Sequence, residues 1–258
     1  MNAAFASEWI KLRRRGMYAA LGAIVGLSGL ITLLGITHAG GDGRRSFMTL
    51  AELAASGGFA RIVQHTGDLL KVVALGVFAS AFASEFSQGT MRNLLVRQPR
   101  RLRLLAGKYL ATVTATAGAL LAALAFSVPV GILAAGAKNV STSAWWTGSG
   151  LSSLAHTEVN LFLACVGYGT IGVLLAIVFR SPVAAIGAGL AYLLPVEGIL
   201  SSVINGATRW LPGQLLDALA SGGNGDVSYR AAALTLAVYG LIAATITGLL
   251  FSRRDVAS

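Results

Sequence analysis

The chain of 258 residues is 55% hydrophobic and only 12% charged. An average soluble domain carries roughly 25% charged residues, because a soluble fold must cover its surface with polar groups. This composition excludes a soluble domain, and the scarcity of acidic and amide residues excludes a disordered chain. The formal net charge of +10 follows the ends of apolar runs rather than forming a nucleic-acid groove. The sequence therefore predicts an all-α membrane protein that does not bind nucleic acid.

The first expected element is a short amphipathic helix before the first apolar run. Phe5, Trp9 and Leu12 share one helical face at i, i+4 and i+7, and Glu8 and Lys11 belong to the polar groups around it. A helix of this kind lies in the membrane interface. The alternative is a plain positively charged flank of the first span.

Six apolar runs follow, and a bilayer crossing takes about 20 mostly apolar residues. The first run is longer than the apolar core of a secretory signal, so we expect a retained helix. The second run begins beside Lys71, which can snorkel to the headgroups or pair with Asp68. We expect one transmembrane domain over residues 1–258, with spans at about 17–36, 69–83, 109–135, 159–179, 183–204 and 231–251.

The segment between the second and third spans is the most distinctive part of the sequence. Glu85 follows the second span, Gly89 permits a tight reversal, and Thr90 can cap a short helix that ends at Pro99. This helix would present an apolar patch flanked by arginines, made of Met91, Arg92, Leu94, Leu95 and Arg97. Such a helix fits a docking site for a soluble partner. The alternative is a basic loop on anionic lipid.

Two further features are expected on the side of the membrane opposite to the segment between the second and third spans. Trp145 and Trp146 lie in the loop 136–158, and paired tryptophans usually mark the membrane interface. A short outer helix is predicted at Leu211–Ala220, because Pro212 suits a first helical turn and Gly222-Gly223 can end the helix.

Glu197 is the one acid that the pattern places well inside a span. An intramembrane charge is costly and marks a candidate functional site, and the neighbouring Pro195 and Gly198 predict a broken helix that lines a cavity. One interpretation is a contact with a substrate cation or a proton. The other is a structural glutamate near the outer end, paired with a neighbouring subunit or held neutral.

The orientation follows from the loops that carry Lys and Arg. Thirteen of the 20 lie in residues 1–16, 84–108, 180–182 and 252–258. The richer side is cytoplasmic by the positive-inside rule. We therefore expect both termini in the cytoplasm and a multi-pass protein of the cell inner (cytoplasmic) membrane.

No catalytic or metal-binding pattern is present in the sequence. The only Gly-Lys pair, Gly107-Lys108, is followed by Tyr109, and Leu102 stands where a P-loop needs its first glycine. We expect no cofactor on this chain. The single cysteine, Cys165, is expected to be a small core residue. The histidines are expected to be solvated loop residues, the alternative being a metal or pH-sensing role, at His38, His65 and His156.

These motifs together resemble those of ABC transporter permeases of the type-2 exporter class. The E…G-T…L-L…P…R…K pattern is matched by Glu85, Gly89-Thr90, Leu94-Leu95, Pro99, Arg101 and Lys108. The start Ser7-Glu8-Trp9-Ile10-Lys11-Leu12-Arg13 resembles the S-E-W-x-K-L-R start of bacterial members. The outer helix at 211–216 also has a counterpart there. One departure is Arg100, where many members carry a small or hydroxyl residue.

The resemblance implies a transport subunit that is not itself an enzyme. Two permease copies, or this chain and a paralogue, would form a path through the bilayer, and two copies of an ABC ATPase subunit would bind ATP and Mg. The helix at 89–99 would be the coupling element on the ATPase, and the N-terminal helix would also touch the ATPase. The substrate would be a lipophilic drug, a peptide antibiotic or a lipid.

An alternative function is a secondary transporter or channel that works without an ATPase and uses Glu197 as its ion or proton site. Such proteins tend to carry several buried ionisable groups or internal repeats, and the sequence offers only this glutamate and no visible repeat. An intramembrane enzyme would need paired acids or histidines inside the spans.

Overall fold

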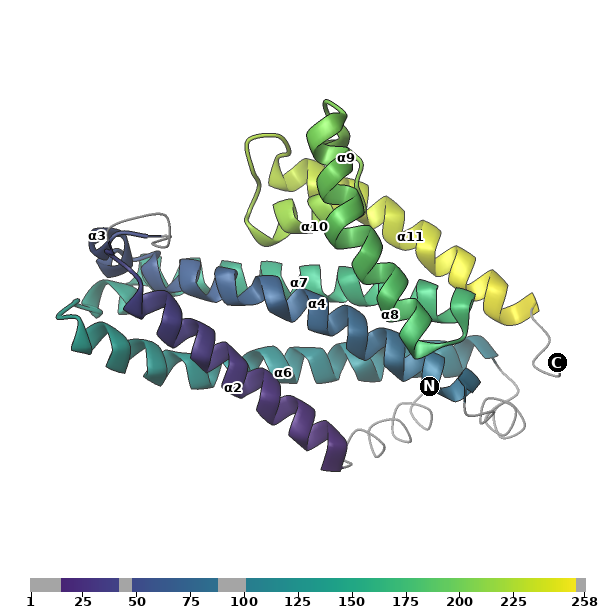
Figure 1. The fold of residues 1–258 in the computed structure, drawn as a ribbon, viewed down its shortest axis with the longest axis horizontal. Helices are drawn as coiled ribbons and strands as arrows, with labels where there is room; N and C mark the ends of the chain where they lie inside the picture. Colours follow the sequence, from purple (N-terminus) through teal and green to yellow (C-terminus); the bar gives the residue numbers. More distant parts are fainter. Residues whose placement is uncertain (1–14, 42–47, 88–100, 254–258) are drawn as a thin grey trace. The chain divides into compact units, whose positions relative to one another are not determined.

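The structure is a computed structural model that describes residues 15–41, 48–87 and 101–253. The helices, labelled as in Figure 1, are α2 Arg15–Thr37, α3 Leu50–Ala54, α4 Gly58–Ser87, α6 Arg101–Ala137, α7 Gly148–Phe179, α8 Pro182–Ala191, α9 Glu197–Val203, α10 Pro212–Ala220 and α11 Tyr229–Arg253. A 3-10 turn (η1) covers Ser143–Trp146, a π turn (η2) covers Tyr192–Val196, and a second 3-10 turn (η3) covers Ala207–Arg209.

Within the described part of the chain, five helices are long and apolar enough to cross a membrane. They are Gly58–Ser87, Leu102–Ala137, Gly148–Phe179, Pro182–Val203 and Tyr229–Leu250. The all-helical class expected from composition is confirmed by this set of long apolar helices. The first predicted span lies in α2, whose described apolar part is the shorter stretch Leu21–Thr37.

Three helices begin earlier than their apolar runs predict. The runs begin at residues 69, 109 and 159, whereas α4, α6 and α7 begin at Gly58, Arg101 and Gly148. A helix continues through a polar flank because each added residue gains a backbone hydrogen bond without a new nucleation cost. His65 and His156, predicted in loops, therefore lie on helices, and both are exposed as expected of solvated histidines.

The described residues form two compact units. The first unit takes the described parts of 71–116 and 163–258, and the second takes the described parts of 13–70 and 117–162. α4, α6 and α7 each contribute one part of their length to each unit. The prediction of a single transmembrane domain stays a prediction.

Close packing of α4 on α7 organises the first unit. A Cβ added at Gly172 would lie 2.6 Å from the Leu75 carbonyl oxygen, and one at Gly169 would lie 2.7 Å from the Phe78 ring. Small residues let membrane helices approach in this way. A core of Phe78, Phe82, Leu104, Val173, Ala176 and Ile177 continues from this contact. Cys165 is buried, as expected of a small core residue.

The second unit has an aromatic core near η1. The Trp145 indole N–H donates to the Leu53 carbonyl at 2.7 Å, and the ring stacks on Phe59 with centroids 5.0 Å apart. The prediction that both tryptophans mark the membrane interface is wrong for Trp145, which is buried. A buried indole is stable because its N–H has found an acceptor. Of this pair, Trp146 is the exposed residue.

A π turn separates α8 from α9 without interrupting the helix. Pro195 has no N–H to donate to the preceding turn, and a π turn accommodates that loss. The Glu197 N–H donates to the Tyr192 carbonyl, five residues back. The predicted irregularity is present, but the helix is wound differently there rather than broken.

The short helix α10 has the predicted start and stop. Pro212 occupies its first turn, and it ends at Ala220. Gly222 and Gly223 have φ of 78° and 107°, and the Gly223 N–H donates to the Ala218 carbonyl. The apolar face of α10 packs against α11 through Leu215, Ala218, Leu219 and Ala232. The helix is thereby held along one side, while its first turn needs a separate partner.

Candidate functional site

The Glu197 carboxylate lies at the N-terminal end of α10. Its Oε1 accepts the Gly213 N–H and its Oε2 accepts the Gln214 N–H, each at 3.0 Å. The N-cap residue of α10, Leu211, has no side-chain oxygen to offer these amides. Glu197 therefore caps α10 from another helix, where a carboxylate also complements the positive end of the helix dipole.

Gly213 makes this approach possible. A Cβ at this position would lie 2.6 Å from Glu197 Oε2 and 3.0 Å from the Leu193 side chain. Glu197 itself is fully buried. The first turn of α10 thus combines a proline that needs no acceptor, a glycine that leaves room, and a buried acid that accepts two amides.

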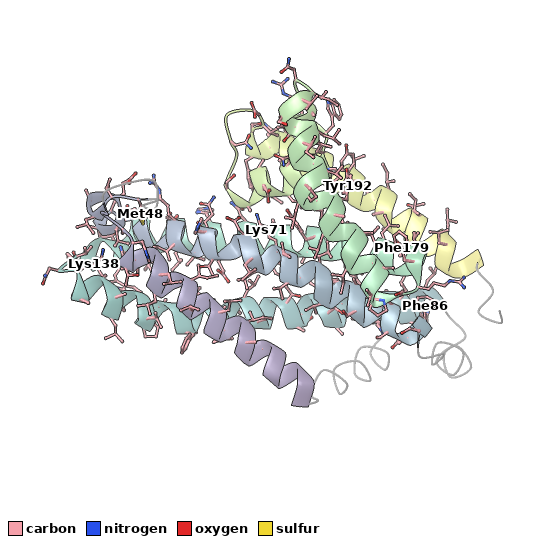
Figure 2. All side chains as sticks on the ribbon, in the orientation of Figure 1. Met48, Lys71, Phe86, Lys138, Phe179 and Tyr192 are labelled. Atoms are coloured by element: carbon pink, nitrogen blue, oxygen red, sulfur yellow. The ribbon has the colours of Figure 1, made fainter. Side chains whose placement is uncertain are left out.

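A second contact joins α10 to α4 and α7. The Lys71 ammonium pairs with Asp217 Oδ1 at 2.5 Å, and the Tyr168 hydroxyl donates to the same oxygen at 3.3 Å. Lys71, labelled in Figure 2, also lies 5.8 Å from the centroid of the Tyr168 ring. The prediction that Lys71 snorkels to the headgroups is wrong. Its side chain is only 6% exposed, because an acid on α10 meets it inside the protein.

A third contact joins α4 to α6. Glu85 Oε1 pairs with the Lys108 ammonium at 2.5 Å, and the two side chains are 10% and 6% exposed. The Lys108 ammonium lies 5.4 Å from the centroid of the Phe82 ring. Sequence reasoning did not pair Glu85 with Lys108. The structure pairs the two because α6 begins early enough to bring Lys108 beside α4.

The two ion pairs have the same construction. Each takes one member from α4, where Lys71 and Glu85 are about four helical turns apart. Each sets a lysine over an aromatic ring, which adds a cation–π attraction in a desolvated setting. The pair of Glu85 and Lys108 is buried on both sides, so it joins its helices in fixed positions rather than offering a reactive group, whereas the Asp217 side chain of the other pair is 46% exposed. We refer to the pair of Glu85 and Lys108 as the α4–α6 clamp.

Most residues of the predicted coupling site lie outside the described residues. They are Gly89, Thr90, Met91, Arg92, Leu94, Leu95 and Pro99. The residues of the predicted interfacial helix, Phe5, Glu8, Trp9, Lys11 and Leu12, also lie outside the description. Arg101 is the first residue of α6, and nothing is described of its side chain. Glu85 and Glu197 are the two predicted site residues whose environments are described.

Sequence reasoning missed Lys108, Tyr168, Asp217 and Glu158 as parts of polar sites. A charged residue next to an apolar run needs a partner, and that signal was present for Lys71 and Lys108. Which partner it meets depends on helices far apart in the sequence. Within residues 15–41, 48–87 and 101–253, no cluster of three or more His, Cys, Asp or Glu side chains could hold a metal ion.

Long apolar helices that dock on one another through buried ion pairs define a multi-pass α-helical membrane protein. α11 agrees with this class, because it exposes a row of apolar side chains suited to lipid, including Leu234, Val238, Leu241, Ile242, Ile246 and Leu249. The chain belongs to the family described as "Protein of unknown function (DUF2705)", whose model matches residues 30–257. No curated protein matches the chain.

Proposed function

We propose that this chain is the membrane-spanning permease subunit of an ATP-binding-cassette exporter. It would form the translocation path with a second permease copy or a paralogue, and it would be driven by two copies of a separate ATPase subunit that bind ATP and Mg. The proposed substrates are lipophilic drugs, peptide antibiotics or lipids, because the apolar spans offer few polar groups to a hydrophilic solute.

The α4–α6 clamp is the observation that carries this proposal. α4 ends at Ser87 and α6 begins at Arg101, so residues 88–100 connect two helices that a buried ion pair already joins. The proposed coupling segment is 88–100. A force applied to this segment by an ATPase would act on both helices together, because separating them would expose two charges to an apolar environment. The clamp thus suits a segment that transmits motion.

The proposed mechanism is a rocking of packed helices between inward-open and outward-open states. ATP-driven closure of the ATPase pair would push segment 88–100, and α4 and α6 would move as one element. Lys108 lies on α6 and its ammonium pairs with Glu85, which argues against a phosphate-binding role for this lysine. ATP chemistry is accordingly assigned to the partner.

The proposed topology has six spans with both termini in the cytoplasm. α2 would supply the first span, because its 23 residues can cover about 30 Å. The five long apolar helices would supply the others. The short helix α10 would lie on the outer side before the last span.

The alternative is a secondary transporter that uses Glu197 as its ion or proton site. Both oxygens of that carboxylate accept backbone amides of α10. This engagement supports a structural role for Glu197, and it weighs against a site that must release its partner in each transport cycle.

The test is affinity purification of the tagged full-length chain from its native membranes in mild detergent. We expect a P-loop ATPase to co-purify in stoichiometric amount. Replacing Gly89 and Leu94-Leu95 should abolish this association. Asp226→Asn is the matched control, because it removes an exposed charge at a distance in the sequence from segment 88–100.

Two outcomes of this purification distinguish the exporter from the secondary transporter. An ATPase lost only from the variants in segment 88–100 would support the exporter and locate the coupling contact. A chain that purifies without an ATPase, from cells that demonstrably produce one, would overturn the proposal and favour the secondary transporter.

A further inference from the structure

A small pocket lies inside the second unit, between parts of α2, α4, α6 and α7. Its polar lining comes from Ser28 on α2, Thr66 on α4, Ser127 on α6 and Glu158 on α7. The remaining lining is apolar and consists of Val63, Leu70, Leu120, Ala123, Leu124 and Leu161. The pocket has room for about one water molecule. Four helices therefore converge on one polar point in an apolar setting.

The hydroxyl groups of this pocket act as acceptors toward its interior. Ser28 Oγ donates to the Val25 carbonyl at 2.7 Å, and Thr66 Oγ1 donates to the Ile62 carbonyl at 3.0 Å. Ser127 Oγ donates to Ser28 Oγ at 3.5 Å. Since each hydroxyl has one proton and that proton is already directed to another acceptor, only oxygen lone pairs remain for an occupant.

The carboxyl group of Glu158 adds a charge to this arrangement. Its Oε1 is buried and has no hydrogen-bond partner among the described residues. No residue that α2, α4, α6 or α7 contributes to the lining, apart from Glu158, is titratable or charged. An ionised carboxylate without a counter-charge is costly in such a place. The ionised form of Glu158 therefore has no positive partner in the lining of the pocket.

We propose that this pocket binds a single monovalent cation, either Na⁺ or a proton taken up by Glu158 beside one bound water. The occupant must be positive or a hydrogen-bond donor, because every polar atom facing it is an acceptor. It must be small, because the space holds about one water molecule. One carboxylate balances one positive charge.

This site goes beyond the proposed exporter function and does not depend on it. Glu158 lies on α7 because that helix begins at Gly148, ten residues before it, rather than near residue 159. A cation here would link α7 to three other helices of the second unit. The binding equilibrium should therefore appear as a change in the stability of the chain itself.

The experiment measures the thermal unfolding midpoint of the purified full-length chain in detergent, without any ATPase. In one arm, NaCl replaces choline chloride or KCl at constant ionic strength and fixed pH. In the other arm, pH rises in buffer free of Na⁺. The variants are Glu158→Gln, Ser127→Ala as a milder change, and Asp226→Asn as an exposed-acid control.

The two arms separate the two cations. If Na⁺ is the occupant, NaCl raises the midpoint by about 3 °C at tenfold excess over its Kd, and Glu158→Gln abolishes the rise. If a proton is the occupant, NaCl has no specific effect, and the wild-type midpoint falls more with rising pH than that of Glu158→Gln. Ser127→Ala should weaken whichever response is seen, and Asp226→Asn should leave it unchanged.

The proposal fails if wild type and Glu158→Gln respond alike in both arms. Should Glu158→Gln not fold, Ser127→Ala decides, and an unaltered response of that variant to Na⁺ and pH overturns the proposal. Loss of ATPase co-purification, by contrast, would bear only on the exporter function.

Discussion

Glu197 and Gly213 meet at the first turn of α10, where the carboxylate of one accepts the backbone N–H of the other at 3.0 Å. The two residues belong to different helical segments, and the N-cap residue of α10 has no capping side chain. An acid that sequence alone marks as a pathway candidate thus accepts one backbone amide on each of its oxygens and helps to hold a short helix in place.

Gly213→Ala should destabilise the chain. The new methyl group would lie 2.6 Å from Glu197 Oε2, so either the carboxylate or α10 must shift. We expect a loss of about 1–3 kcal/mol in the free energy of unfolding, measured by SDS titration in mixed micelles. Gly198→Ala is the control, because its Cβ would meet no atom within 4 Å. Equal stability of the two variants would contradict the capping geometry.

Lys108→Met should lower the free energy of unfolding more than removal of both members of the α4–α6 clamp. The single change leaves Glu85 buried without its ammonium, and breaking a buried pair in this way costs about 3–5 kcal/mol. The double variant Glu85→Leu/Lys108→Met should regain most of that loss. The measurement is a double-mutant cycle on the free energy of unfolding. Additive losses would show that the pair is not coupled.

The ion pair of Lys71 and Asp217 should respond asymmetrically to mutation. The side chain of Lys71 is 6% exposed and that of Asp217 is 46% exposed. Asp217→Asn leaves a buried ammonium without this carboxylate, whereas Lys71→Met leaves an acid that water can reach. We expect the Asp217 variant to be the less stable by about 1–2 kcal/mol on the same SDS titration. The reverse order would mean that the carboxylate is the less hydrated partner.

The capping box of α3 should make that helix sensitive to acid. The backbone N–H of Thr49, followed by Arg61, holds the pKa of the Glu52 carboxyl below its ordinary value of 4.5. The stabilisation is present above the unfolded-state pKa and is lost as pH falls through the folded-state pKa. Hydrogen-exchange protection at Leu53, corrected for intrinsic rates, should therefore decline as the solution is acidified below that ordinary value.

Glu52→Gln provides the comparison for that experiment. The amide keeps the size of the side chain but cannot ionise, so the variant should be less protected at neutral pH and show a flatter pH profile. Asp226→Asn should behave as wild type. Identical profiles for wild type and Glu52→Gln would contradict the role of the carboxylate.

The sequence could predict those features that depend on neighbours along the chain. α10 was located from Pro212 at its start and from Gly222-Gly223 after its end, and both signals act within one helical turn. The apolar runs located the long apolar helices for the same reason. Helix starts were less well located, because hydropathy marks the lipid-facing length, and α4 and α7 extend beyond it.

The polar contacts could not be predicted, because they join residues distant in sequence. Lys71 meets Asp217, and Trp145 meets the Leu53 carbonyl, only after several helices have packed. The sequence indicated that a charge beside an apolar run needs a partner, but it offered no means of choosing that partner. The sequence predicts a loop at 136–158 because small polar residues precede the apolar run. Residues 148–158 are nevertheless helical, and Glu158 therefore lies on α7.

The π turn at Tyr192–Val196 changes the angular register of α9 relative to α8. A π turn contains one residue more than an α turn, and each residue in an α-helix turns the chain by about 100°. Were the helix regular through Pro195, Glu197 would point about a quarter-turn away from the α10 amides that it now caps. Deleting one residue from this turn should therefore misalign the carboxylate while leaving the length and composition of the span almost unchanged.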